Sequence, residues 1–242
     1  ASPVVPAVFG DTLPIDRSVS YLTGQFDPMD RNEFAPVDSN LADRSGLWLR
    51  KDTYAAFQRM HEAAQATGVK LIIRSATRNF AAQKSIWERK WTGTTKLSSG
   101  VSAPDITDPV DRALAILQYS SMPGTSRHHW GTDIDLNAFN NAYFDSGQGL
   151  QVYQWLKQHA HDFGFCQPYT AKGSARPDGY EEEKWHWSYL PVSGILLQEA
   201  RTKIQDTTIS GFAGSETALS IGVVDKYIMG VDTTCQPNYL LR

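Results

Sequence analysis

The chain has 242 residues, of which 41% are hydrophobic and 20% charged, and its formal net charge is −3. This composition is ordinary for a globular protein, and the weak negative charge excludes the basic surface with which proteins bind nucleic acid. No apolar run approaches the ~20 residues needed to span a bilayer, so we expect no membrane span. The length allows one large domain, or one domain with extensions.

Residues 1–46 form the first distinct region, because they are rich in Pro, Asp and Ser and lack a sustained hydrophobic period. We expect an N-terminal arm that packs on the core. Residues 47–242 then make up a single domain that ends in a helical extension. In this extension the sequence predicts helices over 192–203 and 215–229, with Ser215 as the N-cap of the second.

The middle of the chain alternates between helical and extended patterns. A helix is expected over 53–67, with Asp52 as its N-cap and Gly68 at its end. The continuous β-branched run 69–75 predicts a buried strand. Three more helices are predicted, from the Asn79 cap through Trp91, from the Asp108 cap to about Ser120, and over 150–163. The polar loop 92–107 is either a lid over a site or a plain connection.

The stretch 126–136, SRHHWGTDIDL, places two histidines and two aspartates within eight residues. Neutral imidazole and carboxylate are good ligands for a divalent ion such as Zn²⁺. Because side chains alternate in an extended segment, we expect Asp133 and Asp135 on one face, with Ile134 and Leu136 toward the core. A histidine of the preceding turn could then meet an aspartate on one ion. Such clusters also occur in ordinary turns that bind no metal. This stretch alone is therefore compatible with a metal site and with an ordinary turn.

A second cluster, EEEKWHWSY, occupies residues 181–189. If it is a strand, His186 and Ser188 share one face and three aromatic residues share the other. His186 then offers a third metal ligand, and Glu183, three residues earlier, a candidate general base. Catalytic zinc sites use three protein ligands and keep one position open to water, so the number of candidates fits.

Together the two clusters resemble the LAS metallopeptidases. The shared pattern is Ser126-x-His128-x-x-Gly131-x-Asp133-x-Asp135, followed by Glu183-x-Trp185-His186. Over residues 71–189 the chain is most similar to the D-alanyl-D-alanine and L,D-carboxypeptidases of the vancomycin-resistance type. The resemblance implies an α+β fold in which a small, mainly antiparallel sheet carries the metal site and helices surround it.

The resemblance implies that His128, Asp135 and His186 bind zinc and that Glu183 is the catalytic base. One position departs from the family pattern: Asp133 stands where the family usually has a small residue such as alanine. This departure makes Asp133 a second candidate for the aspartate ligand.

The resemblance also implies a substrate-binding set. Arg78, followed five residues later by Gln83, would hold the free carboxylate of the peptide, since a guanidinium binds a carboxylate through two parallel hydrogen bonds. Ser126 would contact the substrate near its terminal residue. From the residues alone, a cap or a surface ion pair is the preferred interpretation of Arg78, and Ser126 could be only a turn hydroxyl.

The implied function is that of a monomeric, zinc-dependent carboxypeptidase that removes the C-terminal D-alanine from peptidoglycan stem peptides. Two alternatives lie in the same group: a D,D-dipeptidase, and an endopeptidase that would not need the Arg78 clamp. A third is a non-catalytic zinc-binding module, against which Glu183 argues because a structural zinc needs no base. Preference for an L- or a D-residue before the cut depends on pocket shape and stays open.

Such a substrate implies an exported protein of the periplasm or cell envelope, and we expect its signal peptide to be absent from this chain. The two cysteines, Cys166 and Cys235, are too far apart for a CxxC motif. In an exported protein they could form a disulfide, whereas in a cytosolic one they would be buried thiols. The sequence leaves both possibilities open.

Overall fold

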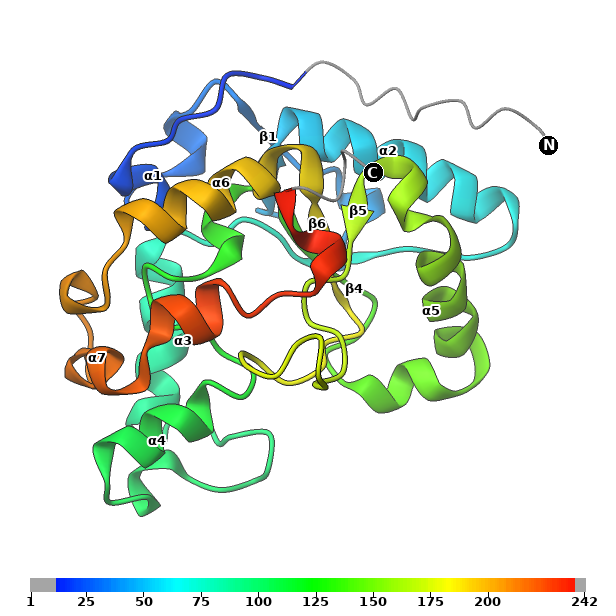
Figure 1. Cartoon of the computed structure of the whole chain (residues 1–242). Coiled ribbons are helices and arrows are strands. Elements are labelled where there is room, and N and C mark those ends of the chain that lie inside the picture. Colours follow the sequence, from blue (N-terminus) through cyan, green and yellow to red (C-terminus); the bar gives the residue numbers. More distant parts are fainter. Residues whose placement is uncertain (1–11, 238–242) are drawn as a thin grey trace.

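A four-stranded antiparallel sheet lies at the centre of the fold, in the order β3-β4-β6-β5 (Figure 1). The computed structural model describes residues 12–237. The strands are short, and a second, two-stranded antiparallel sheet pairs β1 with β2. Their bounds are β1 Phe34–Pro36, β2 Trp48–Arg50, β3 Ile73–Ser75, β4 Asp133–Leu136, β5 Phe165–Cys166 and β6 His186–Tyr189. The predicted α+β class with a small antiparallel sheet is confirmed.

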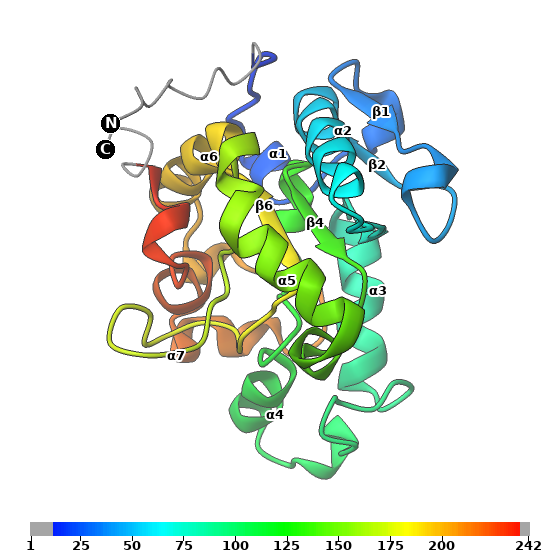
Figure 2. The same cartoon turned by 90° about the vertical axis from the view of Figure 1, so that its right-hand side faces the viewer.

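Helices surround the central sheet. In Figure 1, α5 lies on one side of β4 and β6, α3 lies on the other, and α2 and α6 run along the upper end. Figure 2 shows α5 in front of these strands and α4 at the lower end of the molecule. Among residues 12–237 no helix is both long and apolar enough to cross a membrane. The helices are α1 Val19–Leu22, α2 Lys51–Ala66, α3 Phe80–Trp91, α4 Pro109–Ile116, α5 Gly147–His159, α6 Leu190–Lys203 and α7 Ala218–Ile221.

The register of β4 against β6 brings the two sequence clusters together. Asp133 lies opposite Ser188 and Asp135 lies opposite His186. Side chains alternate along a strand, so these four residues share one face of the sheet. The intervening Ile134 is fully buried in the hydrophobic core. The predicted division of this strand into a polar face and a core face is therefore confirmed.

Local capping signals place two helix starts correctly. The Asn79 side chain accepts a hydrogen bond from the backbone N–H of Ala82, and the Asp108 side chain accepts two from the first turn of α4. The prediction of Asp52 as an N-cap is wrong, because α2 already begins at Lys51. The Asp52 carboxylate instead forms a buried ion pair with Arg50, at 2.7 Å.

Some predicted elements are shorter or broken. Only the last three residues of the run 69–75 form strand β3, and α4 ends at Ile116 instead of Ser120. The prediction of a single helix over 215–229 is wrong. A 3-10 turn, α7 and a π-helical turn replace it, and Gly222 at φ 74° in the left-handed region separates the last two.

The sequence predicts an N-terminal arm over residues 1–46, of which residues 1–11 lie outside the described residues. Within residues 12–46, Tyr21, Leu22 and Phe34 are buried in the hydrophobic core. Tyr21 is buried, and its hydroxyl donates to the carbonyl of Trp130 at 2.7 Å. The Trp130 indole N–H in turn donates to the carbonyl of Leu22 at 3.1 Å. The arm therefore supports the turn that carries the first sequence cluster.

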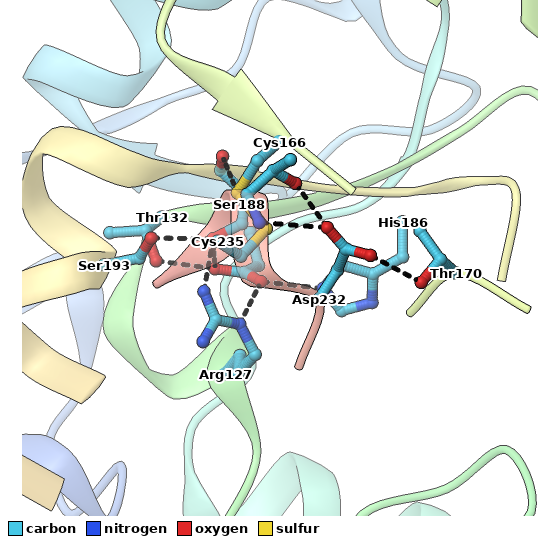
Figure 3. Close-up of a disulfide and its surroundings, with 11 residues drawn as sticks. Arg127, Thr132, Cys166, Thr170, His186, Ser188, Ser193, Asp232 and Cys235 are labelled. Atoms are coloured by element: carbon cyan, nitrogen blue, oxygen red, sulfur yellow. Dashed lines mark hydrogen bonds and ion pairs between the residues drawn. A yellow bond between two sulfur atoms is a disulfide. The ribbon is translucent and has the colours of Figure 1, made fainter. Parts of the chain in front are cut away.

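A disulfide joins Cys166 to Cys235, with 5.6 Å between the two Cα atoms. It fastens the C-terminal segment to strand β5, and Figure 3 shows it beside Ser188. The Asp232 carboxylate accepts a hydrogen bond from the Thr170 hydroxyl at 2.9 Å and adds a second attachment. Of the two possibilities left open for the cysteines, the structure has the disulfide.

Candidate active site

Three buried side chains converge from separate elements: His128 from the 3-10 turn Arg127–Trp130, Asp135 from β4 and His186 from β6. One nitrogen or oxygen atom from each lies within 4.8 Å of those of the other two. The Asp135 carboxylate lies between the imidazoles, 3.3 Å from Nε2 of His128 and 3.5 Å from Nδ1 of His186. These are the three residues to which the resemblance assigns the metal.

The turn before β4 positions His128. The Ser126 hydroxyl caps it by accepting a hydrogen bond from the His128 backbone N–H at 3.2 Å. Gly131 closes it at φ 74°, in the left-handed region that favours glycine. A Cβ at Gly131 would lie 2.5 Å from the ring of Phe34. The close approach of the arm to this turn therefore also requires glycine.

We call His128, Asp135 and His186 the triad. Hydrogen bonds determine which nitrogen of each imidazole faces the centre of this triad. His128 donates through Nδ1 to the Ala76 carbonyl at 2.8 Å, because a carbonyl can only accept. His186 has its Nε2 2.7 Å from the carboxylate of Asp133. The opposite nitrogens both face Asp135, whose Oδ1 is buried and has no hydrogen-bond partner among residues 12–237. Two oriented imidazoles and one such carboxylate oxygen fit a divalent metal ion.

Asp133 is fully buried and is occupied by protein donors. Its Oδ2 accepts from Nε of Arg127 at 3.0 Å as well as from His186, and its Oδ1 accepts from the hydroxyls of Thr132 and Ser188 at 2.6 and 2.8 Å. Burial alone would raise the pKa of this carboxyl, but Arg127 and His186 hold it well below its usual range. Asp133 therefore acts as an ionised anchor for His186 and leaves the other aspartate of the motif facing the centre.

Glu183 lies at the rim of the triad, with Oε2 3.1 Å from Nδ1 of His186. Its backbone N–H donates to the carbonyl of Tyr169 at 2.9 Å, which fixes the start of the second cluster. Burial raises the pKa of the Glu183 carboxyl, and the nearby His186 only partly offsets this. A carboxylate with a raised pKa is a stronger base, which suits general base catalysis.

Arg78 and Gln83 lie together on the other wall of the same cavity. Arg78 donates through Nε to Oε1 of Gln83 at 3.0 Å and through Nη1 to the hydroxyl of Ser75 at 2.6 Å. Gln83 donates to the carbonyl of Ser121 at 2.9 Å, so both ends of its amide are engaged. Arg78 also lies 3.6 Å from Asp135. These contacts orient the guanidinium close to the triad while 24% of its side chain stays exposed.

Two residues near the triad support the protein scaffold. Ser126 is buried and does not line the cavity in the described structure, so its predicted contact with substrate stays a prediction. His129 accepts a hydrogen bond from the Gly124 N–H through Nε2 and donates through Nδ1 to the Arg78 carbonyl at 2.6 Å. Burial lowers the pKa of His129 to about 3, so this neutral ring links the first cluster to the Arg78 segment.

The cavity that contains these groups has a volume of about 360 Å³. The predicted loop 92–107 contributes to its wall and therefore borders the site. Besides the residues above, the lining includes Ile86, Lys90, Thr95, Lys96, Ser98, Tyr119, Ser120, Phe139, Tyr180 and Trp185.

Comparison with known proteins assigns this chain to a protein family. Residues 46–192 match the family VanY: D-alanyl-D-alanine carboxypeptidase. The chain belongs to the VanY family. The match contains both sequence clusters and the segment that carries Arg78.

Relatives of the chain agree with this membership. A D-alanyl-D-alanine carboxypeptidase of Enterococcus faecalis is 30% identical over 147 residues, which are 61% of this chain and 48% of that protein. The chain thus spans about half the length of this relative. The solved structure of VanYB in complex with D-alanine-D-alanine is similar with a TM-score of 0.50 and 26% identity. The similarity covers 69% of this chain and 83% of that one.

Sequence reasoning missed several residues that complete this VanY-family cavity. Tyr169 lies against His186, with 4.8 Å between ring centroids, and Tyr180 stacks edge-on against Tyr169. Their sequence neighbourhood, a turn-rich excursion, contains no periodic signal. Lys90 could have been found, because it lies two helical turns after Gln83 and therefore on the same face of α3.

Proposed function

We propose that this chain is a zinc-dependent carboxypeptidase that removes the C-terminal D-alanine from peptidoglycan stem peptides. One observation carries the proposal: three candidate metal ligands, a buried carboxylate base and an oriented arginine line a single cavity of about 360 Å³. VanY-family membership supports the reaction, and the likeness to VanYB, solved with D-alanine-D-alanine, supports the substrate class.

His128, Asp135 and His186 would hold the zinc ion. The donor set supports this assignment, since imidazole nitrogens and a carboxylate oxygen are typical zinc ligands, and three protein ligands leave one position open. When bound, zinc supplies Lewis acidity and makes water nucleophilic near neutral pH.

Glu183 would take the proton of the attacking water and pass it to the amine that departs from the scissile bond. Its burial supports this role, because the raised pKa makes the carboxylate a better proton acceptor. Arg78 would bind the C-terminal carboxylate of the peptide through paired hydrogen bonds, with Gln83 holding the guanidinium in place. Recognition of a free carboxylate next to the base and the metal ligands favours cleavage at the chain end.

We also propose that the protein acts outside the cytoplasm, in the periplasm or cell envelope. The Cys166–Cys235 disulfide supports this location, because disulfides persist in oxidising compartments and are rare in the cytosol.

The test is incubation of zinc-loaded protein with tetra- and pentapeptide muropeptides, followed by mass analysis of the products. We expect loss of a single C-terminal alanine, and the peptide that loses it identifies the preferred residue before the cut. Glu183→Gln should retain zinc and release no alanine. Release of the dipeptide, or cleavage only within cross-linked stems, would contradict the carboxypeptidase function.

A further inference from the structure

Lys90 and Lys96 are the two lysines that line the active-site cavity, and of the two only Lys90 is partly buried. Lys90 donates from Nζ to the hydroxyl of Ser120. Among residues 12–237, no carboxylate oxygen lies within 4.0 Å of the Lys90 ammonium. An ammonium has three N–H donors, so a single hydroxyl leaves donors for a ligand.

The two carboxylates of the cavity are engaged elsewhere. Asp135 lies between His128 and His186, and Glu183 is in contact with His186. Burial lowers the pKa of Lys90, the charge of Glu183 partly offsets this, and the charge of Arg78 adds to the lowering. A lysine without a contacting anion thus lines the space where a substrate would lie.

The position of Lys90 separates it from the Arg78 clamp. Gln83 and Lys90 are seven residues apart on α3, which corresponds to roughly 10 Å along the helix axis. They contact two consecutive cavity-lining residues, since Gln83 donates to the Ser121 carbonyl and Lys90 to the Ser120 hydroxyl. Arg78 contacts the near side of Gln83, so Lys90 lies beyond this amide.

We propose that Lys90 and Ser120 form a second carboxylate-binding point in the active-site cavity, which selects peptides that carry an acidic group in addition to their C-terminal carboxylate. This inference rests on the proposed carboxypeptidase function and adds a substrate class to it. The acidic group belongs to the residue before the cut or to the one preceding it. These residues lie within ~7 Å of the scissile bond in an extended chain, at 3.3 Å per residue.

The test uses zinc-loaded full chain and two pairs of peptides that end in D-alanine with a free carboxylate. Within a pair the peptides differ only in a side-chain carboxylate or the corresponding carboxamide, at one of the two positions before the cut. The readout is the ratio of kcat/KM values, measured from released D-alanine. For at least one pair the wild type should favour the carboxylate by roughly tenfold to a hundredfold, the range for a hydrogen bond to a charged group.

Variants then assign the preference to Lys90. Lys90→Met should bring the ratio close to 1, and Lys90→Arg should keep part of it. Lys84→Met is the matched control, because Lys84 lies on the same helix outside this cavity and pairs with Glu88. It should keep the wild-type ratio.

Two outcomes would overturn the inference while the carboxypeptidase function stands. One is a wild-type ratio near 1 for both pairs, a result that needs no variant. The other is an equal loss by Lys90→Met on both members of a pair, which would mean that Lys90 acts on Glu183 or on the terminal carboxylate. Absence of D-alanine release from all four peptides would instead overturn the proposed function, and this inference with it.

Discussion

The Nε2 atom of His186 lies 2.7 Å from Oδ2 of Asp133, in the direction away from the centre of the candidate metal site. Arg127 holds the same oxygen at 3.0 Å, so the carboxylate is ionised and fixed. Because Nε2 donates a hydrogen bond to Asp133, Nδ1 is the nitrogen that could bind the metal. An aspartate at a position where the resembled family usually has a small residue thus determines the tautomer of a candidate metal ligand.

We expect Asp133→Asn to weaken zinc binding and leave the ligand set intact. Loss of the carboxylate partner of a metal-bound histidine typically costs 10- to 100-fold in metal affinity, so the zinc dissociation constant should rise by roughly that factor. Competition with a chelator of known affinity measures it. Asp135→Ala should lose zinc far more completely. Full zinc in Asp135→Ala with none in Asp133→Ala would transfer the ligand role to Asp133.

This anchoring role illustrates what a sequence can and cannot predict. The two-residue period of a strand correctly predicts that Asp133 and Asp135 share a face. Their different roles depend on Arg127, and on Ser188, which lies in the other cluster and 55 residues away from Asp133. The contact with Ser188 joins segments so far apart in the sequence that it leaves no local signal around Asp133.

The same distinction holds for the rest of the fold. The caps at Asn79 and Asp108 were predictable because they are satisfied within three residues. The helix expected over 215–229 fails at Gly222, where the backbone enters the left-handed region and apolar spacing gives no warning. The pairing of Cys166 with Cys235 likewise depends on a sequence separation of 69 residues.

Gly131→Ala should destabilise the protein and the metal site together. An alanine there would have φ 74° and a Cβ 2.5 Å from the ring of Phe34, and a strained left-handed residue alone costs ~1–3 kcal/mol. Gly46→Ala is the matched control, since Gly46 has φ 81° and nothing within 4 Å of the added Cβ. Denaturant unfolding should show a larger loss for Gly131→Ala. Equal losses would contradict the close approach of the arm to this turn.

Removal of the disulfide should lower the free energy of unfolding without disturbing the active site. For a separation of 69 residues, loop-closure entropy predicts a loss of roughly 4 kcal/mol when Cys166 and Cys235 are both replaced by serine. His186 lies within the loop that the disulfide closes, but the pairing of β6 with β4 holds it opposite Asp135, so zinc content should be unchanged. The wild-type thiols should react with a label only after reduction. Two thiols that react in unreduced protein would refute the pairing.

The central claim is that the site cleaves at a free C-terminus, and the most direct measurement compares a stem peptide ending in D-alanine with its C-terminal amide. Loss of a charged hydrogen-bond partner typically costs ~2–5 kcal/mol, or roughly 30-fold to several-thousand-fold in kcat/KM. Amidation should lower kcat/KM of the wild type by such a factor.

Arg78→Ala should show a similar loss on the free peptide and little further loss on the amide, with its zinc retained. Arg89→Ala, at an exposed position of α3, the helix that follows Arg78, should behave as wild type. A wild-type enzyme that cleaves the amidated peptide as fast as the free one would contradict the carboxypeptidase account.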